Sequence, residues 1–246
     1  MGSKLVPNWK SISQDPNAPA VLAARRQILA SARKAILIDD RCQYIAQQAS
    51  GKRVLDVGVV EHFAAASHRD EWLHEHVRRA ASSCLGVDIL EEGVRDLQKR
   101  GYEIVYADVT QAPLNEIFDL IVMGEIIEHV GNPGALMKNA ALMLAEGGRV
   151  ILTTPNPWYL NAILKNLFEG LPFTDSTDHV VWFDPSTLAE IGQRAGLTLD
   201  CYAGIKMKHS GSVLSKVAVR LAPALSVLGI RRELFAKSML YEFVRA

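Results

Sequence analysis

Short apolar runs alternate with longer helical patterns after Gly51, and this alternation constrains the fold more than any other feature of the chain. Each run is bounded by polar turns, and the runs are Arg53–Val57, Cys84–Val87, Ile104–Tyr106, Phe118–Met123 and Arg149–Thr153. Helical patterns lie between them, notably over Leu90–Arg100 and Pro133–Ala145. Strands that alternate with crossover helices predict a parallel sheet covered on both faces.

Both ends of the chain add elements to this core. Residues 1–20 carry three prolines (Pro7, Pro16 and Pro19) among polar residues and are expected to form a flexible leader. Residues 21–50 contain neither Gly nor Pro, are rich in Ala and show helical spacing, so we expect one or two helices there. Leu197–Ile205 and Ser238–Val244 are expected to be the last strands, with a helical insertion over Ser212–Leu228 between them.

Charge and cysteine usage exclude several classes of protein. Lys and Arg total 27 and balance the 27 Asp and Glu, so no general attraction to nucleic acid is expected. Three scattered cysteines without metal-type spacing fit the reduced cytoplasm, which is the location we expect. No uncharged apolar run reaches the roughly 18 residues that a membrane span requires.

Acidic residues follow three consecutive predicted strands. Asp56 and Gly58 end the first, Asp88 ends the second, and Asp108 follows the third. Ligands of open α/β sheets bind at the carboxyl ends of the strands. A carboxylate at Asp88 can accept hydrogen bonds from both hydroxyls of a ribose, Asp108 can meet an adenine amino group, and Gly58 allows close approach of the backbone.

The turn after the first strand reads Gly58-Val59-Val60-Glu61-His62 and holds a single glycine. A dinucleotide site needs several glycines there to seat a pyrophosphate on a helix N-terminus, and a nucleotide-binding P-loop needs a lysine. Because both are missing, a nucleoside cofactor without phosphates, such as S-adenosylmethionine (SAM), fits better.

Taken together, Arg53–Gly58, Asp88, Asp108 and Phe118–Val130 resemble the successive motifs of class I SAM-dependent methyltransferases, over about residues 41–199. The resemblance implies a Rossmann-like α/β fold with a seven-stranded sheet and helices on both faces. It also implies a leader (1–20) and one domain (21–246), composed of N-terminal helices (21–50), a SAM-binding core (51–155), and an acceptor lid with the C-terminal strands (156–246).

Within that superfamily the likeness is greatest to O-methyltransferases of ubiquinone biosynthesis. Arg41–Ile45 resembles the segment whose arginine holds the SAM carboxylate, and Val59-Val60 departs from the family, which usually has a second glycine there. The cofactor-binding residues implied by the resemblance are Arg41, Asp56, Gly58, Asp88, Ile89, Asp108, Val109 and Gly124.

The segment Gly124–Val130 carries two carboxylates and a histidine. If it forms a helical turn, Glu125, Glu128 and His129 share one face and could bind a divalent cation such as Mg²⁺. The pattern resembles the E-x-x-E-H motif, with a later histidine, of two metal-assisted groups: the ubiquinone-type enzymes and those that methylate the terminal ribose of small RNAs. It implies that Glu125, Glu128, His129 and His179 are metal ligands.

A metal-free alternative stays open, in which His129 or His179 is a general base. In either case we expect Glu128, His129 and His179 to act in catalysis. The remaining histidines include His74 and His76, which do not face each other on a helix, so a solvated helix over 61–79 is expected rather than a second metal site.

Aromatic residues cluster after the fifth strand, where the acceptor would bind, and they suit both sugars and aromatic rings. A resemblance to methyltransferases encoded beside glycan-assembly enzymes favours a small-molecule or glycan acceptor with a sugar hydroxyl. An RNA ribose methyltransferase and a non-catalytic SAM-binding protein are the alternatives. Residues 212–232 could contact a membrane surface, or pack on the domain or on a second copy in a homodimer.

Overall fold

The computed structural model describes residues 9–60, 72–169, 176–206 and 231–246, apart from the side chains of residues 34–36. The α-helices are α1 (Pro19–Ala32), α2 (Arg41–Ala49), α3 (Leu73–Ala80), α4 (Glu91–Lys99), α5 (Pro133–Met143), α6 (Leu160–Glu169) and α7 (Pro185–Arg194). The strands are β1 (Arg33–Ile38), β2 (Arg53–Val57), β3 (Ser83–Asp88), β4 (Ile104–Tyr106), β5 (Phe118–Gly124), β6 (Leu144–Pro155), β7 (Leu197–Ile205) and β8 (Ser238–Arg245). Short 3-10 helices are η1 (Trp9–Ser11), η3 (Ile127–His129) and η4 (Arg232–Phe235).

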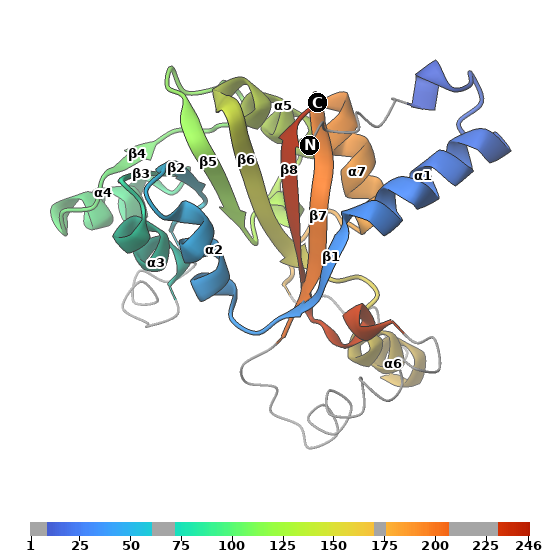
Figure 1. Ribbon diagram of the computed structural model, residues 1–246. Helices are drawn as coiled ribbons and strands as arrows, with labels where there is room; N and C mark the ends of the chain where they lie inside the picture. Colours follow the sequence, from blue (N-terminus) through green and yellow to red (C-terminus); the bar gives the residue numbers. More distant parts are fainter. Residues whose placement is uncertain (1–8, 61–71, 170–175, 207–230) are drawn as a thin grey trace.

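One sheet of eight strands forms the centre of the described part of the chain, in the order β1-β7-β8-β6-β5-β2-β3-β4 (Figure 1). Strand β8 runs antiparallel to β6 and β7, and the other pairs are parallel. The expected α/β sheet is therefore present. Because β2, β3, β4, β5 and β6 are parallel, their carboxyl ends meet at one edge of the sheet.

The expectation of seven strands was wrong by one strand. Residues 33–38, which were expected to be helical, form β1 and pair in parallel with β7 at the edge of the sheet. The helical spacing of residues 21–50 continues only in α1 and α2, on either side of this strand. Pairing with a strand more than 160 residues away overrides local helical preference, as tertiary context often does.

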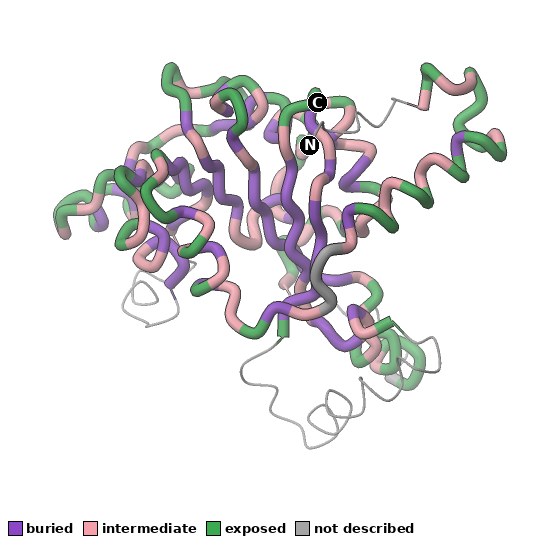
Figure 2. Tube along the Cα trace, viewed as in Figure 1, coloured by how far each residue is buried: buried purple, intermediate pink, exposed green. Residues whose placement is uncertain are grey.

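Helices cover both faces of the sheet, as expected. Side chains of α2 and α3 pack on one face around Ile45, Leu73 and Val77, which are buried. Helices α5 and α7 pack on the other face, where Leu136 and Leu188 join the largest core cluster. The central strands are buried along most of their length, whereas α6 and the outer part of α1 are exposed (Figure 2).

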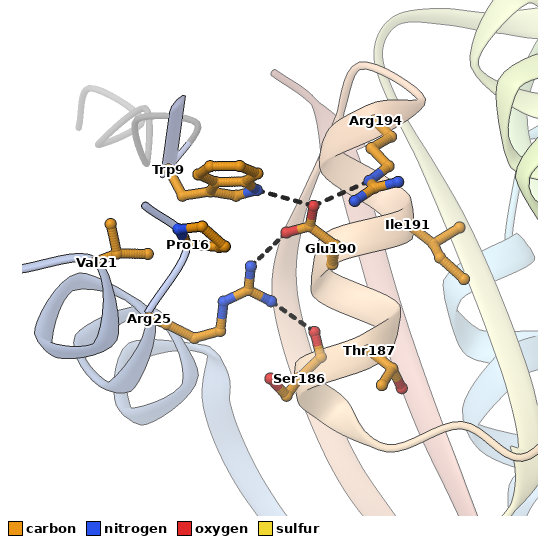
Figure 3. A pocket seen from close by; sticks show the side chains of 9 residues that line it. All are labelled: Trp9, Pro16, Val21, Arg25, Ser186, Thr187, Glu190, Ile191 and Arg194. Atoms are coloured by element: carbon orange, nitrogen blue, oxygen red, sulfur yellow. Dashed lines mark hydrogen bonds and ion pairs between the residues drawn. The ribbon is translucent and has the colours of Figure 1, made fainter. Parts of the chain in front are cut away.

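The N-terminal segment packs against α7 through a set of polar contacts centred on Glu190 (Figure 3). The carboxylate of Glu190 accepts hydrogen bonds from the indole of Trp9 (3.0 Å), from Arg194 (2.9 Å) and from Arg25. Arg25 also donates to the carbonyl of Ser186 (2.8 Å). We call these residues, Trp9, Arg25, Glu190 and Arg194, the Glu190 cluster; they line a pocket of about 540 Å³.

Two expectations concern the chain between β7 and β8. The helical insertion over Ser212–Leu228 lies outside the described residues, as does most of the predicted membrane contact at 212–232. Within the described part of the chain, no helix combines the length and apolarity that a bilayer crossing requires.

Candidate functional site

The turn after β2 brings the backbone to the carboxyl edge of the sheet. Gly58 has a φ of 78°, a conformation that side chains with a Cβ disfavour, and its N–H donates to the carbonyl of Val87 (2.8 Å). A Cβ at this position would lie 2.8 Å from the Cδ1 atom of Ile126. Both the backbone conformation and the space therefore require glycine here.

Asp88 ends β3 beside this turn and is buried. One carboxylate oxygen accepts from the backbone N–H of Val60 (2.8 Å) and the other from that of Leu90 (2.9 Å). Ile89 follows with 60% of its surface exposed. A fixed carboxylate beside an exposed apolar side chain matches the two parts of a nucleoside, a ribose diol and a flat base.

Asp108 lies on the next loop along the same edge and is exposed. It accepts from the backbone N–H of Thr110 (2.9 Å), and hydrogen bonds from Thr110 and Gln111 hold the pKa of its carboxyl below the ordinary value. Val109 is buried, and its carbonyl accepts from the side chain of Asn139 (2.8 Å). Asp108 is thus an ionised acceptor open to a ligand.

Asp56 contacts another side chain of the protein, that of His74, and is not exposed to a ligand in this structure. Its carboxylate is buried, and Oδ2 lies 2.9 Å from Nδ1 of His74. The solvated helix expected over 61–79 is corrected at this point, because His74 is 1% exposed and faces the core with Leu73 and Val77. Contact of Asp56 with the cofactor stays a prediction.

Gly124 ends β5, and Glu125 follows it, next to Arg41 at the start of α2. A Cβ on Gly124 would lie 2.7 Å from Leu73 Cδ2, so this position also requires a small residue. Nη1 of Arg41 lies 3.7 Å from Oε1 of Glu125. The arginine that was expected to hold the SAM carboxylate therefore faces a carboxylate of the protein itself.

The expected grouping of Glu125 with Glu128 and His129 on one helical face was wrong. Glu125 has a φ of 55°, which turns the chain before η3 begins at Ile127. Its side chain lies with Arg41 and Ser238, and burial raises the pKa of its carboxyl despite the charge of Arg41. Glu125 is not in the group of potential metal ligands among the described residues.

Glu128, His129 and His179 form that group, and we call it the Glu128 cluster. Each offers one ligand atom, and the three atoms lie within 4.8 Å of one another. The rings of His129 and His179 meet edge to face, with centroids 4.7 Å apart. The structure thus brings together three of the four residues that the sequence proposed as ligands.

Glu128 is the most constrained member of the cluster. It is 1% exposed, and neither carboxylate oxygen makes a hydrogen bond of normal geometry within the described part of the chain, although the hydroxyl of Thr154 is close enough to offset part of the rise in its pKa. Burial and the neighbouring charge of Glu125 raise the pKa of Glu128 to about 8. A buried carboxylate without well-formed hydrogen bonds is costly unless a proton or a cation compensates its charge.

The loop that carries His179 is tied directly to Glu128. The backbone N–H groups of Val180 (2.9 Å) and Val181 (3.4 Å) donate to the carbonyl of Glu128. On the same loop, Oδ2 of Asp178 lies 3.0 Å from Nδ1 of His129. A carboxylate at this nitrogen favours one orientation of the ring.

Aromatic side chains near this loop divide into two kinds. Trp158, Phe168 and Trp182 are exposed, and the ring of Trp182 lies 6.2 Å from that of His179. Phe183 is buried in the core, and Phe173 lies outside the described residues. The exposed rings are therefore available to an acceptor beside the Glu128 cluster.

Sequence reasoning missed three residues of this region: Trp72, His74 and Asp178. The spacing of Leu73, His74 and Val77 on one face of α3 is the signal that could have indicated the burial of His74. No comparable signal marks Asp178, because its contact with His129 depends on how a distant loop folds back.

Comparison with known proteins agrees with this geometry. A family model described as a methyltransferase domain matches residues 29–202. The ubiquinone biosynthesis O-methyltransferase of Coxiella burnetii is 30% identical over 180 residues, 67% of this chain and 72% of that protein. The corresponding protein of Aeromonas salmonicida is 28% identical over 63% of this chain, and the match spans 66% of its length, slightly less than two thirds.

Solved structures show the same fold. A SAM-dependent methyltransferase from Archaeoglobus fulgidus superposes with a TM-score of 0.55 at 17% identity, over 89% of this chain and 93% of that one. The magnesium protoporphyrin IX methyltransferase from Synechocystis, with bound S-adenosylhomocysteine (SAH), gives a TM-score of 0.54 at 15% identity, over 97% and 93%. Acids at the ends of adjacent strands, the glycine turn and these matches lead to one conclusion: the chain belongs to the class I SAM-dependent methyltransferases, with SAM as its cofactor.

Proposed function

We propose that this chain transfers the methyl group of SAM to a hydroxyl of a small-molecule or glycan acceptor that carries two neighbouring hydroxyls. The observation that carries the proposal is the Glu128 cluster, whose three ligand atoms lie within 4.8 Å of one another at the edge where the cofactor residues gather. The names of the relatives, which are O-methyltransferases, support oxygen as the acceptor atom.

In this proposal the cofactor spans the strand ends. Asp88 binds the ribose hydroxyls, Ile89 packs on the base, and Asp108 accepts from the adenine amino group. Arg41 binds the carboxylate of the methionine part, exchanging its contact with Glu125 for a charged group of the ligand. The methyl group then lies toward the Glu128 cluster.

A divalent cation fits the donor set of this cluster. Glu128 supplies a buried carboxylate without well-formed hydrogen bonds, and His129 and His179 supply imidazole nitrogens. The three ligand atoms lie within 4.8 Å of one another, so these residues could hold one cation after moving inward toward it. When bound, the cation would lower the pKa of a coordinated acceptor hydroxyl.

The protein groups have defined tasks in the transfer. The acceptor oxygen attacks the methyl carbon in line with the sulfur, the carbon–sulfur bond breaks, and SAH leaves. The hydroxyl proton passes to a base, for which His129 is suited because Asp178 lies at its other ring nitrogen. Most of the rate enhancement would then come from positioning and electrostatics.

The exposed aromatic rings support a sugar or a catechol as the acceptor. Trp182 offers a flat apolar face beside His179 of the cluster, and such a face stacks on both kinds of ring. We favour the sugar hydroxyl because of the resemblance of the sequence to methyltransferases encoded beside glycan-assembly enzymes.

The test is production of SAH by chelator-treated protein given SAM and either a catechol or a methyl glycoside with a cis diol, with and without Mg²⁺. Turnover that requires Mg²⁺ and is lost in His179→Ala, but kept in the matched control His76→Ala, supports the proposal. If the rate of turnover is the same with chelator and with added Mg²⁺, the cation is excluded from the mechanism and His129 remains as the proposed base. Tight SAH binding without turnover on either acceptor contradicts the proposed acceptor class.

A further inference from the structure

The turn that precedes the cofactor site carries two valines, Val59 and Val60, directly after Gly58. Val59 is buried, and its carbonyl accepts a hydrogen bond from the indole N–H of Trp72 (3.0 Å). The N–H of Val60 donates to Asp88 (2.8 Å), the residue proposed to hold the ribose. Any shift of this turn therefore moves a donor to the ribose-binding carboxylate.

The space for these valines comes from glycines in the neighbouring elements. A Cβ on Gly86 in β3 would lie 3.2 Å from Cγ2 of Val59, and 3.1 Å from Cε1 of His74. A Cβ on Gly93 in α4 would lie 2.4 Å from Cγ1 of Val60. Glycines on β3 and α4 therefore face the two valines of the turn and leave space for their side chains.

Trp72 and His74 are themselves fixed from several sides. Their ring centroids are 5.1 Å apart, and Tyr102 lies 5.0 Å from Trp72 and 5.9 Å from His74. The guanidinium of Arg78 lies 5.3 Å from the Tyr102 ring. On the other side, His74 holds Asp56 at the end of β2 (2.9 Å). This packing gives both side chains one orientation toward the turn.

We infer that Trp72 and His74 are positioning residues for SAM. Trp72 acts through the carbonyl of Val59, and His74 acts through Asp56 on the strand that leads into the turn. The fit of Val60 against Gly93 completes the arrangement. SAM affinity then depends on residues that need not touch the cofactor.

The first test compares Trp72→Phe with Trp9→Phe, which removes the same indole N–H from a hydrogen bond in the Glu190 cluster. Trp72→Phe leaves a buried carbonyl without its donor and is expected to weaken SAH binding about tenfold by calorimetry at 20 °C. Trp9→Phe is expected to lower Tm and leave SAH binding unchanged. Equal affinities in both variants, or equal losses, would overturn the inference.

The second test changes His74 to Asn, which keeps a donor near the position of Nδ1, and to Leu, which does not. The Asn variant is expected to retain SAH affinity within about threefold, whereas the Leu variant loses about tenfold. If the two variants bind SAH equally well while differing in Tm, His74 has only a structural role.

The third test needs no change in the aromatic cluster. Gly93→Ala introduces a methyl group 2.4 Å from Cγ1 of Val60, so the turn must move, while the higher helix propensity of Ala offsets part of the resulting strain. SAH affinity is expected to fall about threefold to tenfold and to recover in the double variant Val60→Ala/Gly93→Ala. Unchanged affinity in Gly93→Ala, or no recovery in the double variant, contradicts the assignment. Because the readout is SAH binding, failure here leaves the proposed acceptor chemistry untouched.

Discussion

Two glutamates of this molecule, Glu190 and Glu128, are placed in opposite ways. Glu190 accepts from Trp9, Arg25 and Arg194, and these hydrogen bonds outweigh the effect of burial and lower the pKa of its carboxyl. Glu128 is almost fully buried, its carboxylate makes no hydrogen bond of normal geometry within the described residues, and its pKa is raised to about 8.

The difference separates a carboxylate with a structural role, Glu190, from one for which we propose a function, Glu128. A carboxylate surrounded by donors is satisfied in the folded chain and links the N-terminal segment to α7. A buried carboxylate without well-formed hydrogen bonds costs folding energy, and such groups persist where a ligand or a proton compensates them. Two histidines lie beside Glu128, whereas none of the residues of the Glu190 cluster is a histidine. We therefore propose the Glu128 cluster, and not the Glu190 cluster, as the catalytic site.

The largest effect is expected from replacing Glu128 by glutamine. Glu128→Gln should lower turnover by roughly 10²–10⁴-fold, the range that a positioned acid–base group supplies, while SAH binding persists. Glu190→Gln, the matched control, should leave turnover within about twofold. Steady-state kinetics checks both, and an active Glu128→Gln enzyme would remove the distinction between the two sites.

The pH dependence of thermal stability gives a second test of the difference between the two glutamates. In chelator-treated protein, Glu128 is protonated in the folded chain up to about pH 8 but ionises near 4.5 when unfolded, so its presence destabilises the fold increasingly as pH rises between these values. Glu128→Gln should therefore raise Tm more at pH 8 than at pH 5. Thermal denaturation at both pH values is the measurement; a lower Tm at pH 8 would contradict the assignment of an uncompensated carboxylate.

A smaller effect is expected at Asp178, which orients His129. Asp178→Asn should reduce turnover and cation affinity by about 10–100-fold, as is usual for the partner of a ligating histidine, with SAH affinity unchanged. Thr177→Ala, the exposed neighbour on the same loop, is the control, because Ser176 itself donates a hydrogen bond to Asp178. Similar losses in both variants would indicate a general disturbance of the loop.

The smallest effect is expected at the Glu190 cluster. Glu190→Gln should lower stability by about 1–2 kcal/mol, which corresponds to roughly 2–4 °C in Tm for each kcal/mol in a chain of this size. Because the pKa of Glu190 is lowered in the folded chain, its contribution is present above the unfolded pKa and is lost as pH falls toward the folded one. The gap in Tm between wild type and variant should accordingly narrow in acid; a constant gap from pH 7 to pH 3 would argue against the ionised form.

The sequence predicted those features that repeat locally. The strands 53–57, 104–106 and 197–205 agree with the structure at both ends. The acids at or after the ends of the first three predicted strands, Asp56, Asp88 and Asp108, lie along one edge of the sheet as expected. Strand β1 was missed because its pairing with β7 depends on a partner far along the chain. The turn at Glu125 was missed because a φ of 55° in a residue other than glycine leaves no trace in the sequence pattern.

The hydrogen bonds from Val180 and Val181 to the carbonyl of Glu128 have a consequence for the order of events in a catalytic cycle. His179, the third member of the Glu128 cluster, lies on the same loop that these hydrogen bonds hold in place. If these two hydrogen bonds break and the loop moves away, His179 leaves Glu128 and His129 in the same motion. The Glu128 cluster would therefore be complete only while the loop is bound to Glu128. In the proposed function, opening of this loop to release the methylated product would also separate the three residues of the Glu128 cluster. The loop would have to return when the next acceptor binds before methyl transfer could occur again.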